Sequence, residues 1–99
     1  MNVQDWPEPW VAVTDESQRS ALLAELVREL SPGHVLAGAV LRVLARSEAA
    51  DDVLFEVEGR DFRLAEVHLT WRGEMDPRWP RTAVFPDLAD WRANLPEWL

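Results

Sequence analysis

The 99-residue sequence contains no cysteine, lysine, isoleucine or tyrosine. Without cysteine, the chain forms neither disulfides nor zinc sites with thiolate ligands. Without lysine, it has neither a phosphate-loop lysine nor a Schiff-base nucleophile. Lysine, isoleucine and tyrosine have AT-rich codons, so their absence predicts a GC-rich, bacterial gene. No apolar stretch reaches the roughly 20 residues of a membrane span, and the acidic, proline-broken first ten residues are unlike a secretory signal. A cytoplasmic protein without a membrane partner is expected.

The charge is strongly negative, because ten arginines oppose eighteen acidic residues and give a net charge of −8. Nucleic acids require a basic protein surface, so no nucleic-acid partner is expected. The charge is also uneven. Residues 1–59 hold four arginines and eleven acids, whereas residues 60–81 hold five arginines and four acids. The one basic segment is therefore short and lies in the second half of the chain.

The first third of the chain predicts an extended lead-in followed by a helix. Two prolines fix the backbone within residues 1–13, and the two tryptophans there are expected to dock on the body of the protein. The clearest helix covers residues 15–30, since Asp15 can cap it and leucines recur at helical spacing. Glu25 and Glu29 fall on the opposite side of this helix, which predicts that they face solvent.

The remainder predicts strands and one short helix. Residues 36–46 are read as a buried strand, although their alanine and leucine content would also suit a helix. Residues 53–57 and 62–71 alternate as a hairpin around a glycine turn. Residues 82–85 suit a short edge strand, and residues 87–95 suit a final helix.

These elements predict one α+β domain spanning residues 1–99. It contains an N-terminal helix, a three- to four-stranded antiparallel meander and a short C-terminal helix. A three-residue hairpin loop would set Val53 opposite Val67 and Phe55 opposite Ala65. This register gathers the apolar side chains on one face, and both helices are expected to cover that face in a two-layer arrangement.

A row of polar residues follows the strand predicted at 62–71. Glu66, His68, Thr70 and Arg72 alternate with apolar residues and therefore share a face, spaced roughly 6.6–6.8 Å apart. A carboxylate, an imidazole and a guanidinium in line suit acid–base chemistry on an anionic substrate. The alternative, which we favour, is the solvated face of an amphipathic strand, because no nucleophile, glycine-rich loop or second histidine converges on it.

Neither a cofactor nor a metal site is predicted. His34 and His68 lack the spacing of paired metal ligands, and His34 is read as a turn residue. The adjacent carboxylates Asp51 and Asp52 could hold a hard cation, but they are typical of a turn before a strand.

Six tryptophans in so short a chain are the strongest compositional anomaly. Trp71 and Trp91 have core-facing phases, whereas Trp79 lies in a proline-rich loop within the basic segment. Tryptophan and arginine dominate interface hot spots, and they stack on one another. The loop tryptophan either packs beneath its own loop or forms a contact surface. The predicted interaction residues are Arg72, Arg78, Trp79 and Arg81.

Several segments together resemble a known family. Residues 67–73 read VHLTWRG, residues 76–82 read DPRWPRT, a short aromatic helix follows at 88–91, and residues 51–55 read DDVLF. The pattern resembles an uncharacterised family of small bacterial proteins that pair an HLTW strand with a DPxWPxT loop, and it covers most of residues 20–92. The resemblance implies an autonomous domain and transfers no catalytic or binding residue.

Three functions remain open from the sequence. The favoured one is a small, acidic, non-enzymatic interaction module that forms a homodimer or binds another protein, as an immunity-type inhibitor does. The second is a small enzyme or ligand-binding domain that uses Glu66, His68 and Arg72, which requires a concave pocket at that face. The third is an acidic mimic of nucleic acid, for which the carboxylates are too scattered along the chain.

Overall fold

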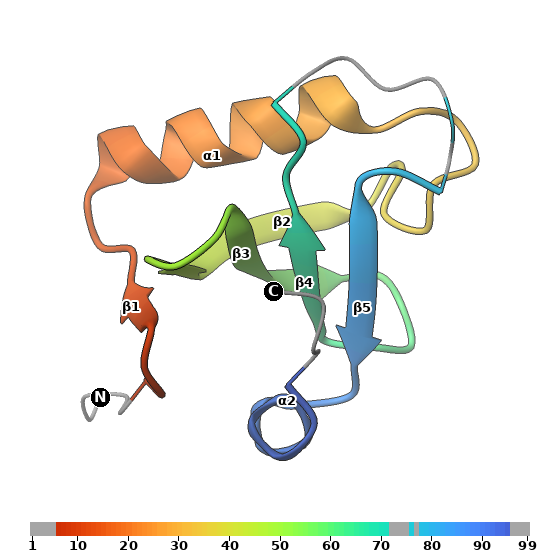
Figure 1. The fold of residues 1–99 in the computed structure, drawn as a ribbon. Helices are drawn as coiled ribbons and strands as arrows, with labels where there is room; N and C mark the ends of the chain where they lie inside the picture. The colour runs from red at the N-terminus through yellow and green to blue at the C-terminus, as the bar shows by residue number, and fades with distance from the viewer. Residues whose placement is uncertain (1–5, 72–75, 77, 96–99) are drawn as a thin grey trace.

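The computed structural model describes residues 6–71, 76 and 78–95, and within them an antiparallel sheet lies between two helices (Figure 1). The sheet has five strands in the sequential order β1-β2-β3-β4-β5. In chain order, the elements are β1 (Trp10–Ala12), α1 (Glu16–Glu29), β2 (Val40–Ser47), β3 (Asp52–Glu58), β4 (Leu64–His68), β5 (Arg81–Phe85) and α2 (Leu88–Ala93). No helix among the described residues has the length and apolar character needed to cross a bilayer.

The α+β class and the antiparallel meander are confirmed, but the predicted number of three to four strands is too low. The additional strand is β1, which lies within the predicted lead-in and pairs with the C-terminal residues of β2. The lead-in prolines precede β1, so residues 10–12 keep their backbone donors and can join the sheet.

Helix α1 begins and ends close to the predicted positions. The Asp15 side chain accepts a hydrogen bond from the Gln18 backbone N–H, as expected of an N-cap. Leu22 and Leu26 are buried against the sheet, whereas Val27, at the margin of the leucine face, is 59% exposed. The buried stripe of α1 is therefore narrower than the apolar pattern suggests.

The central hairpin has the predicted register. Val53 lies opposite Val67 and Phe55 opposite Ala65, and Gly59 turns the hairpin with a φ of +83°. A positive φ is readily available to glycine and costly for most other residues. Alternation and turn chemistry together were enough to predict this pairing.

The prediction that both helices cover one face is wrong, because the two helices lie on opposite faces (Figure 1). Val53 and Phe55 pack in the core beneath α1, while Leu54 packs in a second core with Trp91 of α2. The molecule thus has three layers. The second core could have been predicted from Leu54, since an apolar residue between two core positions indicates a strand that is buried on both faces.

Three tryptophans gather in the core beneath α2. Trp91 is fully buried, and the rings of Trp6 and Trp10 meet it edge-on, with centroids 5.6 and 5.2 Å away. Edge-to-face packing brings the positive edge of one ring to the negative face of another. The prediction that the lead-in tryptophans dock on the body is confirmed, as is the core position of Trp91.

Two strand boundaries differ from the prediction. The strand expected at 36–46 begins at Val40, after a series of turns, and the strand expected at 62–71 ends at His68. Trp71, predicted to face the core, is instead 50% exposed and adopts a φ of +61°. The chain leaves the strand after His68, and the left-handed conformation of Trp71 lies outside the extended region, so the alternation does not continue to residue 71.

Candidate functional site

The predicted polar row begins at Glu66, and the structure places this residue in the protein interior. Glu66 is 1% exposed and lies beneath α2, where its Oε1 atom accepts a hydrogen bond of 2.8 Å from Trp91 Nε1. The reading of the row as a solvated strand face is therefore wrong at this position. The cause is α2, which covers the face that the sequence analysis left open.

A second buried carboxylate, Asp52, lies beside Glu66. Asp52 is the cross-strand partner of His68, and its Oδ1 atom lies 2.6 Å from His68 Nδ1. The His68 side chain is 39% exposed, whereas that of Asp52 is fully buried. Asp52 is thus the first residue of β3 and part of a polar cluster with Glu66 and His68. It does not lie in the turn that the sequence predicted.

The cluster perturbs the protonation of Glu66. Burial, together with hydrogen bonding and repulsion from Asp52, raises the pKa of Glu66 to about 8. The hydrogen bond from Trp91 acts in the opposite direction but does not offset the burial. Glu66 therefore keeps its proton near neutral pH, because ionising it in this buried site beside a second carboxyl group has a large cost.

This geometry does not favour the small-enzyme hypothesis. Glu66 is enclosed by Trp91, so it cannot reach a substrate, and Arg72 lies outside the described residues. Thr70 contributes a backbone N–H to another buried carboxylate, described below, rather than to the row. Among the residues that the structure describes, no three histidine, aspartate or glutamate side chains gather as metal ligands.

The Glu66 pair predicts a pH-dependent stability. Folding raises the pKa of Glu66 from 4.5 to about 8, so its stabilising contribution is complete below pH 4.5 and is lost as the pH rises to 8. The limiting slope is about 1.4 kcal/mol per pH unit for one proton. Glu66→Gln keeps an acceptor for Trp91 and removes the titration. We expect this variant to flatten the decline in urea-unfolding free energy between pH 5 and pH 8.

The exposed Glu58 provides the matched control, because Glu58→Gln removes one carboxylate at the end of the neighbouring strand β3. The Glu58 variant should reproduce the pH profile of the native protein. An unchanged profile for Glu66→Gln would show that Glu66 is ionised in the folded state, and the assignment of the buried proton would be wrong.

Three of the four predicted interaction residues, Arg78, Trp79 and Arg81, lie around the start of β5. The Arg81 guanidinium stacks over the Trp79 ring, 5.4 Å from its centroid, and Trp79 is 37% exposed. Arg78 forms an ion pair of 2.6 Å with Asp76, which lowers the pKa of Asp76 to about 2. The expected arginine–tryptophan stacking is confirmed for Arg81, whereas Arg72 lies outside the described residues.

His34 anchors the segment that enters β5. Its Nδ1 atom accepts a hydrogen bond from the Leu36 backbone N–H, so Nε2 carries the proton and donates to the Pro80 carbonyl at 2.9 Å. The Thr82 hydroxyl donates to the same carbonyl at 3.0 Å. His34 is a turn residue as predicted, and its buried ring fixes the backbone beside Trp79.

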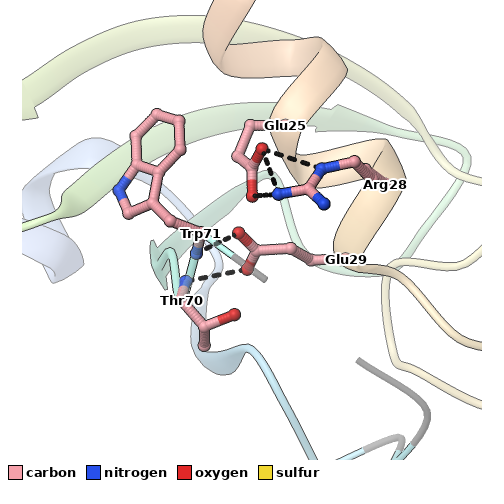
Figure 2. Close-up of polar contacts among 5 residues, drawn as sticks. All are labelled: Glu25, Arg28, Glu29, Thr70 and Trp71. Atoms are coloured by element: carbon pink, nitrogen blue, oxygen red, sulfur yellow. Dashed lines mark hydrogen bonds and ion pairs between the residues drawn. The ribbon is translucent and has the colours of Figure 1, made fainter. Parts of the chain in front are cut away.

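The sequence analysis missed a further buried carboxylate, that of Glu29 (Figure 2). Its two oxygens accept hydrogen bonds of 2.8 and 2.7 Å from the backbone N–H groups of Thr70 and Trp71. The prediction that Glu29 faces solvent is wrong, because the chain leaving β4 folds over this side of α1. The Glu29 clamp, meaning this carboxylate with its two N–H donors, holds Trp71 in its left-handed conformation.

Glu25 lies one helical turn before Glu29, and it is also buried rather than solvent-facing. Arg28 donates to both Glu25 oxygens at 2.9 Å, as Figure 2 shows. Hydrogen bonding with Glu29 and the Arg28 guanidinium lower the pKa of Glu25, while burial and hydrogen bonding with Glu25 raise the pKa of Glu29. Residues at i and i+4 lie on the same face of a helix, so the sequence does show that Glu25 and Glu29 are neighbours. This pairing of two glutamates was the one sign in the sequence that the polar face of α1 has a structural role.

Comparison of the chain with protein-family models, curated proteins and solved structures finds no match. The resemblance to the HLTW family stays a prediction, and the function has to be argued from the geometry of the chain itself.

Proposed function

We propose that the protein is a non-enzymatic interaction module that forms a homodimer through its β5 surface. This surface comprises the outer edge of β5 with the side chains of Trp79, Arg81 and Val84. The proposal rests on one observation: β5 pairs only with β4 within the described sheet, yet it is flanked by exposed apolar side chains. An exposed edge strand of this kind is a template for pairing with another chain.

The two edges of the described sheet differ. β1 has three residues and follows two prolines, which limits its use as a pairing edge. β5 has five residues, its one charged side chain is Arg81, and Val84 in the strand is 41% exposed. Natural edge strands are protected by charge, proline or bulges, and β5 lacks such protection along residues 82–85.

A two-fold dimer through β5 is self-complementary in sequence. Antiparallel pairing centred on Ala83 sets Arg81 opposite Phe85 and Thr82 opposite Val84 of the second copy. Like charges directly opposite one another would destabilise the pairing, and this register brings none together. Two-fold homodimers are also the commonest assembly of soluble proteins.

The β5 surface is held in place before binding. His34 and Thr82 both bond to the Pro80 carbonyl, and Arg81 stacks on Trp79. A preformed surface loses less conformational entropy on association, and a tryptophan with an arginine beside it is typical of an interface hot spot.

The Trp79→Ala variant tests this proposal. We expect it to weaken the dimer by more than about 1 kcal/mol, which corresponds to at least a roughly fivefold higher dissociation constant. Sedimentation equilibrium over a concentration series measures the effect. Trp79 is 37% exposed, so part of its packing is lost as well, and urea unfolding measures this change in stability separately from the change in association.

Val27→Ala is the control, because Val27 is an exposed apolar residue on α1, away from β5. A second variant, Val84→Arg, adds a charge to the strand edge and should produce a monomer. If both β5 variants associate as tightly as the control, the dimer does not use this surface.

A further inference from the structure

A groove of about 570 Å³ lies on the side of the sheet that carries α2. Its walls come from the lead-in, the end of β1 with the segment that follows it, the first turns of α1, strands β2 and β3, the start of β4 and the start of α2. The volume is within the range of about 300–1,000 Å³ that is typical of small-molecule sites. The groove is lined by neither Glu66 nor His68, and it is separate from the β5 surface.

One part of the groove is apolar. Trp6, Leu44, Leu64 and Leu88 line it, and all four belong to the core beneath α2 or pack against it. Their side chains come from four different segments of the chain, so the apolar part exists only in the folded protein. Such a surface suits a flat ring or a short alkyl chain.

Three guanidinium groups line the same groove, although the protein as a whole is strongly acidic. The Arg19 Nε–H is engaged with the Val13 carbonyl at 2.9 Å. Within the described part of the chain, the side chains of Arg42 and Arg63 form neither a hydrogen bond nor an ion pair, and only their backbone groups are bonded in or beside the sheet. These two side chains therefore have free donors, and a guanidinium matches the two oxygens of a carboxylate.

The acidic residues of the groove limit the charge of its ligand. Glu56 is the cross-strand partner of Arg42 but is not ion-paired with it, and the Asp87 side chain caps α2 through the Asp90 N–H. Arg19 is also ion-paired with Glu16, which lies 3.9 Å away and outside the lining, so two unpaired guanidinium groups face two carboxylates. A ligand with a single negative charge meets less repulsion from Glu56 and Asp87 than a phosphate with two charges does.

We propose that this groove binds a small amphipathic monocarboxylate. The apolar body of the ligand lies against Trp6 and the three leucines, and its carboxylate accepts hydrogen bonds from Arg42 and Arg63. The proposal does not depend on the dimer, because none of its residues belongs to β5.

Isothermal titration calorimetry with octanoate and naphthalene-2-carboxylate tests the proposal, and the neutral amides of the two acids serve as matched ligands. We expect saturable binding of at least one acid, and at least tenfold weaker binding of its amide. The indole N–H resonance of Trp6 in a ¹⁵N-labelled sample should shift on binding. Inorganic phosphate should bind more weakly than the acid.

The double variant Arg42→Gln/Arg63→Gln should lose at least tenfold in affinity for the acid and leave the affinity for the amide unchanged. Arg60→Gln, which changes an exposed arginine outside the groove, is the control. The urea-unfolding midpoint confirms that each variant is folded. Three results would overturn the proposal: no saturable binding of either acid, equal affinity for acid and amide, or full affinity in the double variant.

Discussion

Replacing Trp91 with alanine should destabilise the folded protein by about 4 kcal/mol, the largest effect expected of any substitution in this chain. Trp91 is fully buried, and its ring packs edge-on against the rings of Trp6 and Trp10. Its removal leaves a cavity among these rings and takes the hydrogen-bond donor from Glu66. Urea denaturation followed by far-ultraviolet circular dichroism measures the loss.

Trp91→Phe separates the two contributions. Phenylalanine keeps an aromatic ring in the core but cannot donate to Glu66, so a loss of about 1–3 kcal/mol is expected from the unpaired carboxyl oxygen. Trp79→Ala is the control for tryptophan content, since Trp79 is 37% exposed and should lose less stability than the fully buried Trp91. A loss below 1 kcal/mol for Trp91→Ala would contradict the role of α2 as a cover of the second core.

The second large effect concerns the Glu29 clamp. Glu29→Ala should destabilise the protein by about 3 kcal/mol, because it leaves the Thr70 and Trp71 N–H groups without their acceptor and opens a cavity under α1. Without the carboxylate, the left-handed conformation of Trp71 loses its support. Urea denaturation gives the stability, and hydrogen exchange of the two amides reports on the clamp directly.

Glu29→Gln should lie between the native protein and the alanine variant. An amide offers one acceptor oxygen, and its NH₂ group faces the second backbone donor. Glu16→Gln, in the exposed first turn of α1, is the matched control and should be nearly neutral. If the Thr70 and Trp71 amides exchange at native rates in Glu29→Ala, the clamp does not hold this segment.

Local patterns predicted the features of the fold that depend on neighbouring residues. The cap at Asp15, the glycine turn at Gly59 and the hairpin register of Val53 with Val67 are all confirmed. Each depends on backbone chemistry or on side-chain alternation, and both can be read in a few consecutive residues.

The predictions that were wrong concern residues whose surroundings come from segments distant in the sequence. Glu29 looks solvent-facing on a helical wheel, and it is buried because residues 70 and 71, some 41 and 42 positions later, fold against it. Glu66 has the same explanation, since α2 returns to cover the second face of the sheet. A helical wheel or a strand alternation cannot show which segment covers the polar side.

The candidate surfaces also differ in whether neighbouring residues or distant segments form them. Composition predicted an arginine–tryptophan surface near Trp79, and the stacking of Arg81 on Trp79 agrees with it. The groove with Arg42 and Arg63 was not predicted, because its lining comes from seven separate parts of the chain. None of those parts has a motif of its own.

The most direct test of the proposed function is the molecular mass of the native protein across a concentration series, measured by sedimentation equilibrium. The β5 surface predicts a reversible dimer of twice the 11.3 kDa chain mass. A mass of one chain at every concentration up to the millimolar range would contradict the homodimer. The exposed edge of β5 and the ring of Trp79 would then have no role in self-association.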